Sequence, residues 1–315
     1  MQWFKKGLIF KAENENEYLR SHAANPFAVK LSNDIFRVYF SGRNFENKSS
    51  VGYFDFDIKK TLTVNVASKP LVIFGSEQSF YKDGISIGNL YENNGRKYFL
   101  FMGWNIPTNA HWRGDIGQLE LIDFDKMKVT SETPFIGTSE EDPISLSYPF
   151  VMFVEDTYKM WYGSTINWTS ENGEMIHVIK YATSKNGIDW DKKGVCIPYK
   201  LGVAQAFSRP TVILLNEVYH MWYSYRSGDG TKYRIGYSYS FDGETWIARN
   251  DKAGITVSDN LDENNMVCYP HVIIHEEQLY MFYNGNDYGK NGVLMATMPV
   301  IDFINSFNSI VNNLK

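Results

Sequence analysis

The sequence has few cysteines, no excess of basic residues and no long apolar run, and each shortage argues against a class of protein. Its 315 residues include two cysteines, Cys196 and Cys268, without CxxC or Cys/His spacing, so neither a disulfide framework nor a structural zinc site is indicated. The 31 Lys and Arg residues stand against 36 Asp and Glu. Without a basic cluster, no nucleic-acid partner or anionic membrane surface is expected.

Apolar residues make up 43% of the chain but never form a segment of the roughly 18 residues that a membrane span needs. The N-terminus also lacks the apolar core of a secretory signal. These absences predict a cytoplasmic protein without a membrane span, and they leave its oligomeric state open. The apolar fraction is large enough for a packed core, so the composition excludes a disordered chain.

Aromatic residues are abundant, at 16% of the chain, and they recur at a regular interval. The alignment positions of five aromatic segments are separated by 61, 61, 61 and 60 residues, at Phe40, Phe101, Tyr162, Tyr223 and Tyr283. Each segment follows an apolar strand that starts near a proline or glycine corner, and a third alternating strand comes after it. In two repeats a turn resembling an Asp-box, SKNGIDW or SFDGETW, leads into a fourth strand.

Four antiparallel strands per repeat, five times over, predict an all-β fold, a five-bladed β-propeller. We expect a single domain over residues 1–315, with blades near 23–70, 82–135, 146–200, 207–258 and 267–298. Residues 3–10 copy the outer strand at 190–197, so we expect this N-terminal strand to complete the last blade. The only helix expected is a short C-terminal one around Val300–Asn312.

The first strand of each propeller blade lines the central axis, so residues at its corners should meet in one pocket. These corner residues and their neighbours are Asn25, Asp83, Tyr148, Arg209, Tyr269, His22 and His271. A second ring should come from the loops after the aromatic strands, with Arg43, Trp104, Asn105, Arg226 and Asn286. Amides and guanidinium groups hydrogen-bond sugar hydroxyls, and aromatic faces pack on sugar rings, so a sugar or glycan ligand is predicted.

The arginines leave two interpretations open. Arg209 could anchor a ligand or form an internal salt bridge, and Arg43 and Arg226 could bind a phosphate or carboxylate or join neighbouring blades. The histidines His22 and His271 could act as acid or base, or be packed and hydrogen-bonded. Neither has an HxH or HExxH partner, so no protein-ligated metal is expected, and no cofactor motif is present.

The NP, DG, YP, RP and YP corners, together with the MWYS-type aromatic strands, resemble the five-bladed propeller superfamily of glycoside hydrolases, which includes arabinanases, β-xylosidases, invertases and levansucrases. More narrowly, RVYFSGRN, FMGWN and MVCYPHV resemble an uncharacterised family encoded among bacterial surface-polysaccharide genes. That family is similar to the N-terminal part of plant glucosamine inositolphosphorylceramide transferases.

The wider resemblance implies three catalytic carboxylates, whose positions fall on Asn25, Asp83 and near Ser147. Only Asp83 is a carboxylate, so it is the predicted catalytic residue, and the usual mechanism with two carboxylates is in doubt. Displaced acidic residues that could substitute are Asp115, Glu141, Asp142, Glu174, Asp262 and Glu263. Three hypotheses follow: an enzyme acting on a glycan or glycosyl donor, a non-catalytic glycan-binding or scaffold propeller, and a glycosyltransferase.

Overall fold

The computed structural model describes residues 1–312, and its regular structure is nearly all β-strand. Four groups of strands pair antiparallel in chain order. They are β2 (Ser21–Lys30), β3 (Ile35–Arg43), β4 (Ser49–Asp57) and β5 (Leu62–Val66); β6 (Gly84–Asn93), β7 (Arg96–Asn105), β8 (Arg113–Asp123) and β9 (Lys126–Val129); β10 (Ser145–Val154), β11 (Thr157–Asn167), β12 (Ile176–Ser184) and β13 (Asp191–Val195); β14 (Ala206–Leu215), β15 (Val218–Arg226), β16 (Arg234–Ser240) and β17 (Ile247–Ala248).

A fifth group joins the two ends of the chain. It consists of β18 (Cys268–His275), β19 (Gln278–Asn284), β20 (Val293–Pro299) and the N-terminal strand β1 (Phe4–Phe10). In the β1–β20 pair, Phe4 lies opposite Thr297 and Phe10 opposite Val293. The prediction that the N-terminal segment joins the last group of strands is therefore confirmed. Such pairing covers an edge that would otherwise be open to other chains.

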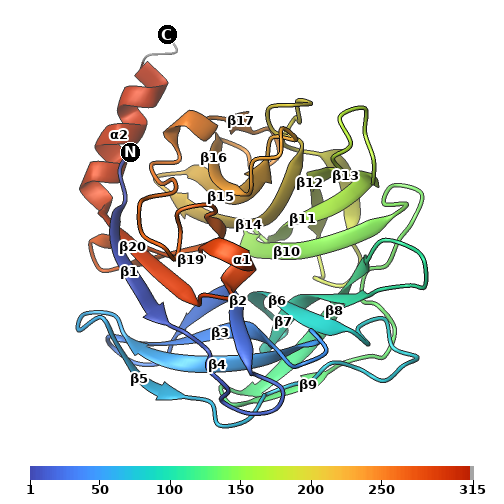
Figure 1. The fold of residues 1–315 in the computed structure, drawn as a ribbon. Helices are drawn as coiled ribbons and strands as arrows, with labels where there is room; N and C mark the ends of the chain where they lie inside the picture. The colour runs from blue at the N-terminus through green and yellow to red at the C-terminus, as the bar shows by residue number, and fades with distance from the viewer. Residues whose placement is uncertain (313–315) are drawn as a thin grey trace.

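The first strands of the five groups lie next to one another around a common centre (Figure 1). Strand β6 contacts β2 and β10, β14 contacts β10 and β18, and β18 contacts β2, so the circle of contacts closes. The repeated aromatic residues form much of the core between the groups, and Trp161, Trp222, Tyr162 and Tyr223 are fully buried. Their repetition at 61 residues thus reports a packing requirement of the fold.

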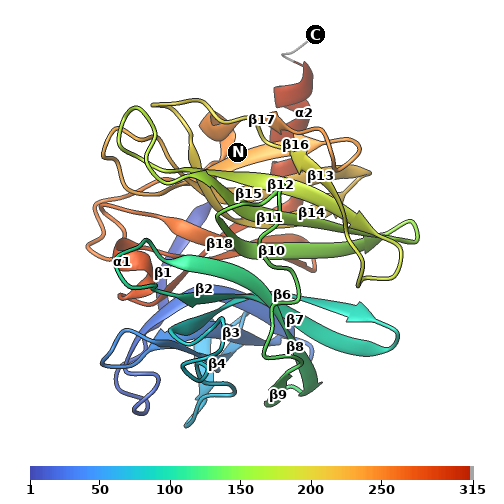
Figure 2. The ribbon, with the colours of Figure 1, turned by 90° about the vertical axis from the view of Figure 1, so that its right-hand side faces the viewer.

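Helix α2 (Val300–Asn312) has the bounds that the sequence predicts. Its Phe303 and Ile310 are buried in the same cluster as Trp222 and Met281, and Figures 1 and 2 show α2 on the outside of the molecule. The expectation of no other helix was wrong. A 3₁₀ turn, η1 (Asn250–Lys252), and the short α1 (Asn286–Gly289) occur earlier, and both are too short to give a helical periodicity.

Within residues 1–312, no helix is long and apolar enough to cross a membrane. The predicted domain extends to residue 315, and its last three positions lie outside the described residues.

Candidate functional site

A cavity of about 650 Å³ lies over the first strands and is lined by loops that follow the second strands. Aromatic side chains form much of its wall, and they are Trp104, Trp112, Trp168, Tyr148, Tyr233, Tyr269 and Tyr288. Its polar lining includes Arg43, Arg226, Glu174, His111, His177, Ser86, Ser147 and Ser208. A small pocket of about 30 Å³ shares Arg43, Ser86, Tyr148, Tyr269 and Tyr288 with this cavity and adds Asn25. The small pocket therefore adjoins the cavity.

Four of the predicted corner residues lie at a distortion of their strand. Asn25, Tyr148, Arg209 and Tyr269 have φ values of 57°, 39°, 53° and 53°, in the left-handed region. Each coincides with a register shift between the first and second strand of its group. A bulge of this kind redirects side chains, and non-glycine residues with positive φ carry local strain. The bulges bring Asn25, Tyr148 and Tyr269 to the two pockets.

The placement of Asp83 at the fifth such corner was wrong. In β6 the register shift falls between Ile87 and Leu90, so Gly88 and Asn89 occupy the corner. Asp83 precedes the strand, and its Oδ2 accepts a 2.7 Å hydrogen bond from the backbone N–H of Ile106. It is absent from the lining of both pockets. The catalytic role predicted for Asp83 therefore has no positional support.

Arg209 binds the backbone of other strands instead of lining the cavity. Its Nη2 donates to the carbonyl oxygens of Asn25 (3.0 Å) and Pro26 (3.1 Å), and its Nη1 donates to that of Ile87. Burial lowers the pKa of Arg209 to about 10. Arg209 does not line the cavity and forms no salt bridge within residues 1–312, because its guanidinium donates to backbone carbonyls of β2 and β6.

The other predicted residues divide into two sets. Arg43, Trp104, Tyr148, Arg226 and Tyr269 line the cavity, and Asn25 lines the small pocket. The residues His22, Asn105, His271 and Asn286 line neither of them.

The residues of the second set have local partners. Asn105 donates to the carbonyl of Phe80, and Asn286 hydrogen-bonds the segment 261–266. Burial lowers the pKa of His22 to about 4 and that of His271 to about 3, so both are neutral near pH 7.

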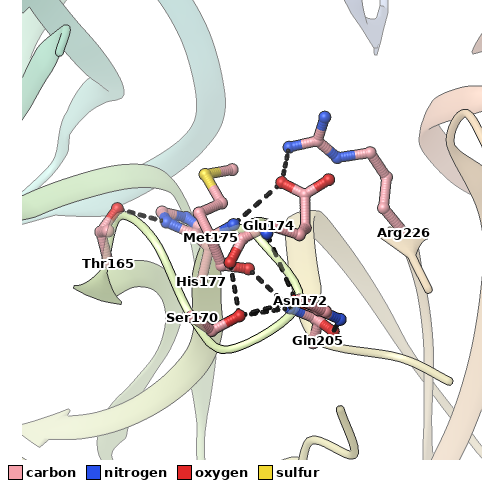
Figure 3. Close-up of polar contacts among 8 residues, drawn as sticks. All are labelled: Thr165, Ser170, Asn172, Glu174, Met175, His177, Gln205 and Arg226. Carbon is pink, nitrogen blue, oxygen red and sulfur yellow. Dashed lines mark hydrogen bonds and ion pairs between the residues drawn. The ribbon is translucent and has the colours of Figure 1, made fainter. Parts of the chain in front are cut away.

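Glu174 reaches the cavity from the loop between β11 and β12 (Figure 3). This loop turns at Gly173, where φ is 77°, and the N–H of Ser170 donates to the carbonyl of Glu174 at 3.0 Å. The fully buried side chain of Gln205 stabilises this turn by hydrogen bonds. Its Oε1 accepts from Asn172 Nδ2 at 2.6 Å, and its Nε2 donates to Ser170 Oγ at 3.1 Å. Gln205 is a positioning residue for Glu174.

The two carboxylate oxygens of Glu174 have different surroundings. Oε1 accepts from Arg226 Nη2 at 2.8 Å and from the N–H of Met175 at 3.0 Å. Oε2 accepts no hydrogen bond from the residues that the structure describes. The side chain is 22% exposed, so this oxygen is open to a ligand or proton. One oxygen is fixed, and the other is available.

His177 lies at the edge of the cavity in a short hydrogen-bonded chain. Its Nε2 is 2.6 Å from Ser147 Oγ, and its Nδ1 is 2.7 Å from Thr165 Oγ1. Burial lowers the pKa of His177 to about 3, so the ring is neutral. Ser147 is fully buried and His177 is 2% exposed. We therefore assign Ser147, His177 and Thr165 a structural role at the edge of the cavity.

The other candidate acidic residues are not among the residues that line the cavity. Asp142 pairs with Lys180 and Lys192, Glu263 pairs with Lys5, and Asp115 pairs with Arg113. All three acids are nearly inaccessible to solvent. Within residues 1–312, Glu174 is thus the one carboxylate in the cavity lining.

Sequence reasoning missed the residues of two loops, chiefly His111, Trp112, Trp168 and Met175. His111 and Trp168 stack with ring centroids 4.7 Å apart, and Trp112 meets Trp168 edge-on at 5.0 Å. The sequence did contain a signal for these loops. Trp112 and Trp168 lie outside the 61-residue aromatic repeat, in two long polar segments that follow second strands.

No protein-family model matches the chain. It is 36% identical over 300 residues to the uncharacterized proteins MT1551 and Rv1502 of two Mycobacterium tuberculosis strains, CDC 1551 and H37Rv, and the match covers 95% of this chain and 99% of each relative. Among solved structures, a glycoside hydrolase gives a TM-score of 0.74 at 14% identity, over 93% of this chain and 91% of that one. A thermostable family-43 glycoside hydrolase gives 0.65 at 13% identity, over 89% and 90%. At these identities the structural similarity shows the fold.

Proposed function

The chain belongs to the family of the mycobacterial proteins MT1551 and Rv1502, and from this starting point we propose that it binds a glycan or glycosyl donor in the cavity and acts on it. The observation that carries the proposal is one carboxylate, Glu174, in an aromatic-walled cavity with two arginines. Tryptophan and tyrosine faces pack on sugar rings, and the polar groups bind hydroxyls. The glycoside hydrolase fold supports a carbohydrate-active protein, although fold alone does not define a reaction.

For the architecture, we propose that the five strand groups are the blades of one five-bladed propeller that forms a single domain. The closed circle of contacts among the first strands supports this count. The resemblance to the surface-polysaccharide family and to the plant transferases suggests a role in surface-polysaccharide metabolism. A cytoplasmic location remains a prediction.

Among reactions, glycosyl transfer fits the cavity better than hydrolysis by paired carboxylates. Hydrolysis of that kind needs two carboxylates about 5–10 Å apart, and the described lining has Glu174 alone. Transfer needs a single base. As the acceptor oxygen bonds to the anomeric carbon, the bond to the leaving-group oxygen breaks, and the acceptor proton moves to Oε2 of Glu174. Arg226 and the N–H of Met175 would keep the carboxylate in place during this step.

The test uses the purified protein with sugar nucleotides, acceptor sugars and aryl glycosides, with products detected by mass spectrometry. Glu174→Gln should lower turnover by about 10²–10⁴-fold, the usual contribution of a general base. Glu171→Gln, in an exposed position of the same loop, is the matched control and should leave turnover unchanged. Full turnover in Glu174→Gln would contradict the assignment. Asp83→Asn should have no effect, and a loss there would favour the original sequence prediction.

Non-catalytic glycan binding is the second candidate, and the ion pair to Arg226 favours it. One oxygen of Glu174 is already bound by Arg226 and by the N–H of Met175, and the carboxylate can accept hydrogen bonds from sugar hydroxyls without taking up a proton. This alternative predicts saturable sugar binding with no product from any donor and acceptor pair. Product formation by the unchanged protein would exclude it.

A further inference from the structure

The small pocket contains a buried polar group without a partner. Asn25 is 2% exposed, and its Oδ1 accepts no hydrogen bond from the described part of the chain. Its backbone is fixed, because its N–H donates to Asn284 Oδ1 at 2.9 Å and its carbonyl accepts from Arg209. Leaving a buried acceptor unpaired is unfavourable, and such groups are few in folded proteins. The residue lines the small pocket together with Arg43.

Arg43 lines both pockets and is the second unusual feature. Its guanidinium makes no ion pair or hydrogen bond with any side chain or carbonyl of residues 1–312, whereas Arg226 on the same cavity is paired with Glu174. Arg43 and Arg226 outnumber Glu174 in the lining, so a formal count of these three groups gives an excess of one positive charge. This charge matches a ligand with a single negative charge.

The size of the small pocket restricts that ligand further. Its volume of about 30 Å³ is room for about two water-sized groups, since one water needs roughly 10–15 Å³ on this measure. A carboxylate has two oxygens, whereas a phosphate has four and carries more charge near pH 7. Tyr148 and Tyr269, with ring centroids 5.6 Å apart, are available beside the pocket to pack on the rest of the sugar.

We propose that the ligand is an acidic sugar of the uronic-acid type, whose carboxylate pairs with Arg43 where the small pocket adjoins the cavity. Guanidinium and carboxylate form paired, charge-assisted hydrogen bonds, which are stronger than those to neutral hydroxyls. This inference rests on the proposed function, because it assigns the class of sugar that the same cavity takes.

The test is a glycan array and calorimetric titration with matched neutral, uronate-containing and phosphorylated sugars. The unchanged protein should prefer the uronate over its neutral counterpart by at least about tenfold, which corresponds to about 1.4 kcal/mol. Arg43→Gln should weaken binding of the uronate by about tenfold more than binding of its neutral counterpart, so that the preference disappears. Arg96→Gln, at a side chain that is 67% exposed and lies outside the cavity, is the control and should keep the preference.

A second variant guards against a folding artefact. Asn25→Asp keeps the side-chain shape and a residue type that tolerates positive φ, and its negative charge should weaken uronate binding more than neutral-sugar binding. Equal binding of neutral and acidic sugars, or preference for phosphorylated sugars, would overturn the acidic-sugar proposal and leave the proposed function in place. Absence of binding to every sugar would contradict both.

Discussion

Asp142 and Glu174 belong to the same strand group, β10 to β13, but they differ in how fully their oxygens are bound. Asp142 is fully buried between Lys180 (2.9 Å) and Lys192 (2.7 Å), and it accepts from the hydroxyl of Tyr162 at 3.0 Å. Glu174 is partly exposed, and among residues 1–312 its one ion-pair partner is Arg226, while Oε2 accepts no hydrogen bond. We infer that a buried acid with both oxygens bound stabilises the fold, whereas an acid with an unbound oxygen can take part in chemistry.

Removal of the Asp142 carboxylate should have the largest effect on stability. Asp142→Ala leaves the buried Lys180 and the partly buried Lys192 without their shared carboxylate, and loss of one partner of a buried pair typically costs about 3–5 kcal/mol. Chemical denaturation would measure this as a lower midpoint. The control is Glu141→Ala, an exposed neighbour that should leave the midpoint unchanged. A midpoint for Asp142→Ala equal to that of the unchanged protein would contradict the stabilising role assigned to Asp142.

A smaller effect is expected when Asp142 is protonated and not removed. Burial by itself would raise the pKa of Asp142, but Lys192 and Lys180 outweigh burial and hold the pKa below its ordinary value. A depressed folded-state pKa gives stability that is present above the unfolded pKa of about 3.9 and is lost as the pH falls through the folded pKa.

Denaturation midpoints measured from pH 6 down to pH 2 would test this titration. Above about pH 4 both proteins should lose stability alike, because buried His22, His177 and His271 have lowered pKa values and the unfolded chain binds protons first. Below about pH 4 the unchanged protein should lose additional stability, because its Asp142 carboxyl then binds a proton in the unfolded chain first. Asp142→Asn should be less stable at pH 6 and lose less on acidification. Parallel pH curves for the two proteins would contradict the assignment of this acid-sensitive stability to Asp142.

The strands could be predicted from the sequence because packing imposes the repeat. Trp161 and Trp222 stand 61 residues apart and are both fully buried, so the period of the aromatic residues is the period of the core. The corner residues could also be predicted where a proline follows the bulged residue, as at Tyr148 and Arg209. Strand β6 has no proline there, and the Asp83–Gly84 pair was mistaken for its corner, which lies at Gly88.

The cavity could be predicted only in part, because its loops are placed by contacts between distant residues. Glu174 was one of six displaced acids in the sequence, and nothing local separated it from Asp142. Its position depends on Gln205, which lies 33 residues from Asn172 and binds it through a buried amide. The position of Arg209 outside the cavity lining could not be predicted for a similar reason, since the carbonyls that bind it belong to β2 and β6. Sequence spacing does not report such partners.

The smallest effect is expected for the stability of Glu174→Gln. The glutamine side chain keeps a carbonyl oxygen that can accept from Arg226 and from the N–H of Met175, and a partly exposed ion pair contributes about 1 kcal/mol or less. The buried Gln205 network that shapes the loop does not involve the Glu174 carboxylate, so the turn should persist. Chemical denaturation beside Asp142→Asn, which also replaces one carboxylate by an amide, gives a matched measurement. A loss in Glu174→Gln as large as that in Asp142→Asn would mean that Glu174 holds the fold in the same way, and it would remove the structural reason for assigning the chemistry to its free oxygen.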